Sequence, residues 1–304
     1  MRGLDCRVDL AFLLFCWRRN RTRYASFFGF STSEGCMDQL ALLRSIRNNE
    51  KSAVGLRIPP GVSPKGLATA LYHNTVTTQL VLSGNAQWTL AEFCEVLESL
   101  SNSTSLKVLD LSDMALDDDF LPHVSEFVAH SESLVRLDLS HNYFTTDTAR
   151  ELGEAIKGHK TLRVLSVEQC DFSDEPLSAF VDAVGSGSDY PLQRFYCGHN
   201  HLSAAAGEKL AKLLLASERA TALNSNGNFF PNELMMKLQT HFASNKEKMK
   251  ARSAAAFGEI GLLLRSAEEI NELDALPTLS FLAACLKRDA GVEAVIESPT
   301  RART

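Results

Sequence analysis

Residues 134–142 read Leu-Val-Arg-Leu-Asp-Leu-Ser-His-Asn, with leucine at the first, fourth and sixth positions and asparagine at the ninth. This spacing predicts a short strand that turns its leucines toward a core and is followed by a turn at the asparagine. Residues 106–114 read Leu-Lys-Val-Leu-Asp-Leu-Ser-Asp-Met and repeat the pattern 28 residues earlier. Self-similarity at a spacing of this size is typical of a repeat architecture.

The pattern recurs in seven units along the chain. They start at residues 53, 77, 106, 134, 162, 192 and 220, at intervals of 24, 29, 28, 28, 30 and 28 residues. From residue 106 onward, apolar residues also recur 15, 18 and 22 residues after each start, which predicts one face of an amphipathic helix. Each unit is therefore predicted to contain a strand, a turn and a helix.

These motifs resemble the leucine-rich repeat family in its long-repeat, ribonuclease-inhibitor-like class, and the resemblance covers roughly residues 38–245. It implies an α/β fold, a leucine-rich repeat solenoid (horseshoe) with parallel β-strands on the concave side and α-helices on the convex side. It also implies a ladder of inward-pointing ninth-position residues that satisfy backbone groups at the turn. The ladder residues are Asn85, Asn142, Asn200 and Asn228, with Cys170 as a replacement.

The two ends of the chain depart from the repeat. Leu40 and Leu43 precede Ala53 by the offsets at which helix residues precede later units, which predicts an N-terminal capping helix over residues 37–52. The repeat domain is predicted over 53–245, because the next unit would begin at Lys248 and lacks a leucine row. Residues 246–304 have a helical composition and are predicted to form a C-terminal cap or a tail that binds a partner.

Residues 1–36 differ from the rest of the chain in charge. They hold six arginines and three acidic residues, so this segment is +3 and the remainder is −9. The apolar stretch Leu10–Cys16 beside arginines is compatible with a targeting peptide. Acidic residues before that stretch and Arg18 and Arg19 after it favour a poorly ordered extension ahead of Met37. The corresponding locations are the cytoplasm or, as the alternative, an organelle reached through residues 1–36.

Composition and motifs exclude several classes of function. The 304-residue chain has a net charge of −6, whereas nucleic-acid-binding proteins carry a basic face. Its seven cysteines form no C-x-x-C pair, so neither a disulfide framework nor a zinc site is expected. The longest apolar run, Leu10–Trp17, is shorter than the roughly 20 residues of a membrane span. Nucleotide-binding and hydrolase motifs are absent, so we expect a non-enzymatic protein without a cofactor.

One histidine pair has a spacing compatible with metal binding. His199 and His201 form an H-x-H sequence. However, His199 occupies the repeat position that His141 and Asp113 occupy in other units, immediately before the ladder residue. Repeat geometry therefore accounts for His199, and no metal site is expected.

The third, fifth and seventh positions of each unit point away from the core, because side chains alternate along a strand. On the predicted concave face this selects seven partner-binding candidates: Asp110, Arg136, Asp138, Glu168, Arg194, Tyr196 and Asn224. Asp110 and Asp138 occupy equivalent positions on adjacent strands, about 4.8 Å apart, so a basic partner would relieve their repulsion. The alternative is that Arg136 neutralises one carboxylate and the face is simply polar.

These observations predict a scaffold or regulatory subunit that binds a partner protein through the concave face. Analogy with the family adds a cytoskeletal assembly as a setting. The alternatives are a GTPase activator of the Ran-activator type and an enzyme-inhibitor horseshoe. Against the activator, no arginine stands before the ladder positions, where the chain has Asp113, His141, Gln169, His199 and Gly227. No motif names the partner or sets an oligomeric state.

Overall fold

The computed structural model describes residues 39–101, 103–185 and 190–268, with side chains described as far as residue 252. The chain divides into two compact units, Met1–Leu42 and Leu43–Thr304, and the fold below is that of the second. The predictions for residues 1–36 and for the tail from 269 onward lie outside the described residues.

Seven strands of three residues each form one parallel sheet in chain order. They are β1 (Gly55–Arg57), β2 (Gln79–Val81), β3 (Val108–Asp110), β4 (Arg136–Asp138), β5 (Val164–Ser166), β6 (Arg194–Tyr196) and β7 (Ala222–Asn224). Each strand pairs with the next so that equivalent repeat positions lie opposite each other, as between Val108 and Arg136. The predicted register is confirmed.

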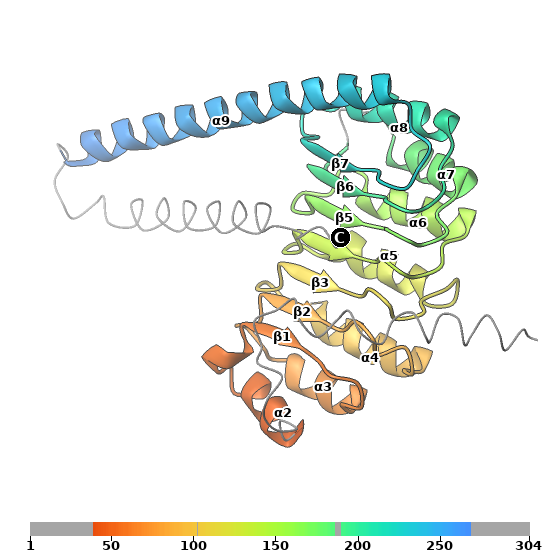
Figure 1. Cartoon of the computed structure of the whole chain (residues 1–304). Coiled ribbons are helices and arrows are strands. Elements are labelled where there is room, and N and C mark those ends of the chain that lie inside the picture. The colour runs from red at the N-terminus through yellow and green to blue at the C-terminus, as the bar shows by residue number, and fades with distance from the viewer. Residues whose placement is uncertain (1–38, 102, 186–189, 269–304) are drawn as a thin grey trace, which may run out of the picture. The chain divides into compact units, whose positions relative to one another are not determined.

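Helices alternate with these strands. They are α2 (Gln39–Arg47), the 3-10 helix η1 (Lys51–Ala53), α3 (Pro64–Leu71), α4 (Leu90–Leu100), α5 (Leu121–His130), α6 (Thr146–Ile156), α7 (Asp174–Val184), α8 (Ala204–Ala216) and α9 (Asn232–Glu268). Helices α3 to α8 lie together on one side of the sheet (Figure 1). The predicted α/β leucine-rich repeat solenoid is therefore confirmed.

The core lies between the sheet and these helices. The central strand residues Leu109, Leu137 and Leu165 are fully buried, and they stack on one another because the strands are in register. Phenylalanines extend the core toward the helices, with Phe172 edge-to-face against Phe144 at a centroid distance of 5.3 Å. Each repeat thus buries its apolar residues against its neighbours rather than within itself.

The ladder residues behave as predicted. Asn142 Nδ2 donates to the carbonyls of Leu111 and Leu139, both at 2.9 Å, and its Oδ1 accepts from the backbone N–H groups of Met114 and Leu116. Cys170 keeps the donor function of the asparagine amide, since its Sγ donates to the Leu139 carbonyl at 3.2 Å. The ladder therefore joins each turn to the preceding repeat.

The residue before each ladder position has a left-handed backbone. The φ angles of His141, Gln169 and His199 are +61°, +53° and +57°. Their N–H groups donate to the next repeat, as from His199 to the Asn226 carbonyl at 2.7 Å. The placement of His199 is therefore a property of the repeat, as its sequence position indicated.

Helices continue the solenoid toward both ends of the second unit. Near the first repeat, the Ile46 carbonyl at the end of α2 accepts a hydrogen bond from Asn74 Nδ2 at 2.7 Å. At the other end, α9 runs without interruption through the predicted boundary between residues 245 and 246. Leu223 in the edge strand β7 is only half-buried, whereas its counterparts in inner strands are fully buried. The division into domains stays a prediction.

Candidate protein-interaction surface

The first and third residues of each strand form the sheet face opposite helices α3 to α8, which we call the helix-distal face. In β3, β4 and β6 these residues are half-buried and flank a buried central residue. This alternation shows that side chains with repeat positions three and five point away from the core. The helix-distal face corresponds to the surface that the sequence predicts as concave.

All seven predicted partner-binding residues lie on this side of the sheet or at its margin, and all are half-buried. They are Asp110 on β3, Arg136 and Asp138 on β4, Glu168 just after β5, Arg194 and Tyr196 on β6, and Asn224 on β7. The structure therefore places them on one surface. Their role in binding stays a prediction.

Asp110 and Asp138 lie directly opposite each other on β3 and β4, and we call them the aspartate pair. Each carboxylate is held by the serine two residues later. Asp110 Oδ1 accepts from the N–H and hydroxyl of Ser112 at 2.9 and 2.6 Å, and Asp138 Oδ1 accepts from the Ser140 N–H at 3.1 Å. The repeated Leu-Asp-Leu-Ser sequence therefore orients two like charges side by side.

Burial raises the pKa of Asp110 above its ordinary value, and the charge of Asp138 raises it further. The hydrogen bonds from Ser112 and the charge of Arg57 on β1 lower the pKa, but they do not cancel the increase. An ionised Asp110 therefore costs the free protein stability. A cation from a partner would remove that cost.

The sequence left open that Arg136 neutralises one of these carboxylates. In the described part of the chain, neither Asp110 nor Asp138 forms an ion pair. The guanidinium that acts on Asp110 belongs to Arg57, which sequence analysis missed because the first repeat is degenerate. Arg57 occupies the fifth position of its repeat, as Asp110 does in the repeat that starts at residue 106, and this equivalence could have identified it from the sequence.

Glu168 and Asn224 pair with each other across an intervening strand. Asn224 Nδ2 donates to Glu168 Oε1 at 2.5 Å, although the residues are 56 positions apart. Gly198 makes room for this bond, since a Cβ at that position would lie 3.1 Å from Glu168 Oε1. These two candidates therefore stabilise the face and are less available to a partner than the aspartate pair.

A small apolar cluster lies on the helix-distal face. Val135 and Val164 are buried against each other, and the half-buried ring of Tyr196 packs on them. Val164 stands between Arg136 and Arg194, which occupy the equivalent position on the strands to either side. Tyr196 is thus held in place by packing, as residues at binding hot spots commonly are.

Replacing Asp110 by asparagine is expected to stabilise the free protein at neutral pH. Because the folded-state pKa of Asp110 is raised, its ionisation lowers stability as the pH rises from the ordinary carboxyl range through that pKa. The asparagine amide would keep an oxygen that accepts from Ser112 without carrying the charge. Thermal unfolding at pH 7 should show a melting temperature about 2–4 °C higher, as a gain of about 1 kcal/mol gives in a domain of this size. The difference should vanish near pH 3, and a gain independent of pH would contradict the assignment.

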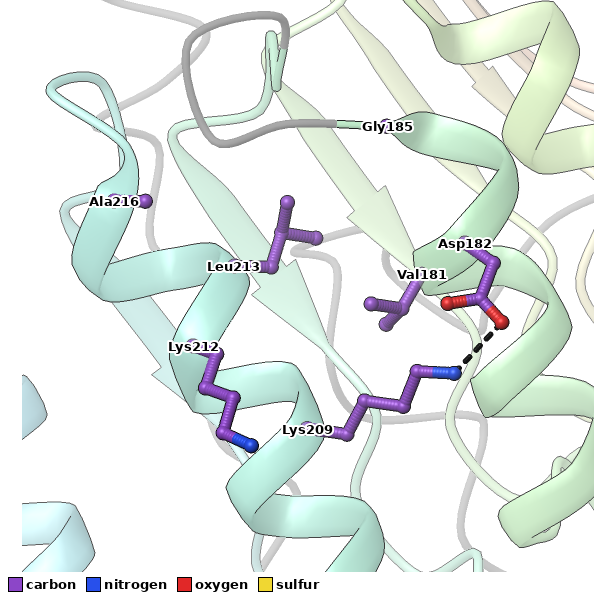
Figure 2. Close-up of a pocket in the computed structure, with 7 residues that line it drawn as sticks. All are labelled: Val181, Asp182, Gly185, Lys209, Lys212, Leu213 and Ala216. Carbon is purple, nitrogen blue, oxygen red and sulfur yellow. Dashed lines mark hydrogen bonds and ion pairs between the residues drawn. The ribbon is translucent and has the colours of Figure 1, made fainter.

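A second candidate surface is a hollow on the helix side, between α7 and α8. Val181 and Leu213 form its apolar floor, and Lys209 and Lys212 lie along one wall (Figure 2). Lys209 Nζ is 2.7 Å from Asp182 Oδ2 and also donates to the Ser178 hydroxyl. Because Lys209 is satisfied within the protein, we regard the helix-distal face as the better candidate.

The described residues offer little for metal-binding, membrane-spanning or thiol chemistry. No group of three or more His, Cys, Asp or Glu side chains there is arranged to hold a metal ion. No helix in the same part of the chain is long and apolar enough to cross a membrane. The free cysteines Cys170 and Cys197 are buried, and burial raises the pKa of both thiols, to about 12 for Cys170.

Comparison with protein families shows that the Leucine Rich Repeat family model matches residues 133–154. A search of curated protein sequences finds no significant match. The matched segment contains β4 and most of α6, which together form one strand–turn–helix unit. The match covers one repeat, and the seven strand–helix units in register give the chain a leucine-rich repeat fold.

Similar solved structures include the tropomodulin C-terminal domain from Caenorhabditis elegans, at 11% identity and a TM-score of 0.42, covering 72% of this chain and 99% of that one. Leiomodin-1 actin-binding site 2 is 14% identical with a TM-score of 0.42, over 75% and 99%. The leucine-rich repeat-containing protein LegL7 from Legionella pneumophila is 20% identical with a TM-score of 0.44, over 62% and 60%.

Proposed function

We propose that this protein is a non-enzymatic interaction module, a scaffold or regulatory subunit that binds a partner protein through the helix-distal face. The observation that carries the proposal is the aspartate pair, two adjacent carboxylates without an ion pair in the described structure. Arg194 and Tyr196 lie on the same face, and arginine and tyrosine are enriched at binding hot spots. A partner on this surface would bury about 1,600 Å² in total, the size of a typical specific interface.

The chemistry of the described residues supports binding rather than catalysis. A nucleophilic cysteine needs a thiolate, and the buried Cys170 and Cys197 thiols have raised pKa values. An activator of the Ran-activator type would need an arginine in the loops after the strands. The positions before the ladder hold Asp113, His141, Gln169, His199 and Gly227 instead.

Within the leucine-rich repeat proteins, we place the chain in the ribonuclease-inhibitor-like class. Repeats close to 28 residues that each contain a full α-helix support this placement. We also propose a cytoplasmic location, since the free Cys170 and Cys197 favour a reducing compartment. Delivery to an organelle through residues 1–36 is the alternative, and imaging of the chain with and without that segment separates the two.

Replacing Arg136 and Tyr196 together by alanine is expected to abolish capture of the partner from a cell lysate. Both side chains lie on the helix-distal face, outside the leucine core. Loss of two hot-spot residues costs several kcal/mol of binding, which is about a thousandfold in affinity. Affinity purification followed by mass spectrometry measures the loss. A thermal melt of the variant shows whether removing the Tyr196 ring from its contact with Val164 has also weakened the fold.

The matched control changes the same residue types away from this face. Tyr72 is 62% exposed after α3, and Arg150 is an exposed residue of α6. A Tyr72→Ala, Arg150→Ala variant should capture the partner as the wild type does. Equal capture by the Arg136 and Tyr196 variant would rule out the helix-distal face as the binding surface.

A further inference from the structure

We infer that the helix-distal face fits one kind of partner, an α-helix lying across the strands with acidic side chains on one flank and a basic side chain on the other. The inference deepens the proposed function and rests on it. It follows from three features of the face, namely two separate rows of opposite charge, their spacing, and a strand backbone whose hydrogen-bonding groups are used within the sheet.

The charged strand residues of β3, β4 and β6 are sorted into two rows. Arg136 and Arg194 occupy the first residue of β4 and β6 and form the arginine row, whereas the aspartate pair occupies the last residue of β3 and β4. The two rows are about 6.6 Å apart, because they lie two residues apart along parallel strands. In the described structure neither arginine forms an ion pair with the aspartate pair. A ligand of complementary charge therefore needs acidic groups facing the arginine row and a basic group facing the aspartate pair.

Spacing along the arginine row matches a helix. Arg136 and Arg194 are separated by one strand, which puts their backbones about 9.6 Å apart. Residues seven apart in an α-helix are about 10.5 Å apart along the axis and lie on the same flank. Two acidic residues at that interval would meet the two guanidiniums in turn. A basic residue on the opposite flank would then lie over Asp110 and Asp138.

The backbone of the sheet also favours a helix. Strand N–H groups are used within the sheet, as where Val164 N–H donates to the Val135 carbonyl at 3.0 Å. The face therefore offers only side chains to a bound segment. An extended peptide pressed onto it would lose water from backbone groups that find no partner, whereas a helix satisfies its own. The half-buried Val108 lies in line with the arginine row and the half-buried Tyr196 in line with the aspartate pair, and both supply apolar contact beside the charged groups.

The test is a selection with the full-length protein as bait. The probe is a phage-displayed library on a stable helical scaffold, in which the exposed positions of one helix are drawn from alanine, leucine, glutamate and arginine. We expect enrichment of helices with two glutamates seven residues apart and an arginine on the other flank. Failure to enrich any helix, or enrichment of helices without this charge pattern, would overturn the inference.

A selected helix is then synthesised and its affinity measured by fluorescence anisotropy. The Asp110→Asn, Asp138→Asn variant and the Arg136→Gln, Arg194→Gln variant should each bind at least about tenfold more weakly. An Asp147→Asn, Arg150→Gln variant removes an exposed ion pair on α6 and should bind normally. Replacing the peptide glutamates by glutamine should weaken binding to the wild type but not to the variant without the arginine row. Equal effects on both proteins would show that the glutamates do not meet that row.

The result also separates this inference from the proposed function. If lysate capture depends on Arg136 and Tyr196 but no helix is selected, the interaction function stands and the helical partner is wrong. If neither is observed, both are wrong. Self-association of the wild type that the Asp110→Asn, Asp138→Asn variant abolishes would assign the face to a second copy of the chain and overturn the inference.

Discussion

Replacing Asn142 by alanine is expected to lower the free energy of unfolding by about 3–5 kcal/mol, among the largest effects of a single substitution. The amide makes four hydrogen bonds to buried backbone groups of two successive repeats. Each group left unpaired costs about 1–3 kcal/mol, and water entering the space recovers part of the total. Urea unfolding of the variant measures the change.

Two further substitutions at ladder positions should each lower the free energy of unfolding by less than Asn142→Ala does. Asn142→Cys should lose less than Asn142→Ala, because a thiol can donate as Cys170 does to the Leu139 carbonyl. Asn85→Ala should also lose less, since within the described residues Asn85 Oδ1 has no hydrogen-bond partner and only the donating half of the amide is used. Equal losses for all three variants would mean that the ladder bonds do not set the stability of the turns.

Replacing Leu137 by alanine should cost about 2–5 kcal/mol, as for other fully buried leucines. Leu137 is the central residue of β4 and is fully buried between Leu109 and Leu165 of the adjacent strands. The cavity would therefore open in the middle of the stacked row, where neither neighbouring strand can move without breaking its own contacts. The midpoint of urea unfolding reports the loss.

Two controls make the Leu137 result specific to the register. Arg136→Ala changes the preceding residue of the same strand but should have an effect within about 0.5 kcal/mol, since its side chain points away from the core. Leu223→Ala removes the equivalent leucine from the edge strand β7, where it is only half-buried, and should cost less than Leu137→Ala. If Arg136→Ala lost more stability than Leu137→Ala, residue 136 rather than residue 137 would face the core, and the register described above would be wrong.

Local pattern alone was sufficient to predict the repeat units, the strand register and the side of the sheet to which each side chain belongs. A leucine-rich repeat contacts only its neighbours, so residues 28 apart share one environment, and the pattern repeats often enough to be recognised. The ladder bonds of Asn142 and the equivalent positions of His141 and His199 followed from the same periodicity, whereas the left-handed backbone of the two histidines is a finding of the structure. The seven candidate residues were placed on one surface for this reason.

Tertiary structure decided which of those candidates remain available for binding. The bond between Glu168 and Asn224 spans two repeats and depends on the missing side chain of Gly198. The action of Arg57 on Asp110 also spans two repeats and depends on rotamers. Repeat periodicity specifies a position on the sheet but not the reach of a long side chain. The aspartate pair was thus predictable from sequence, whereas only the three-dimensional arrangement of the described residues showed that Arg136 forms no ion pair with it.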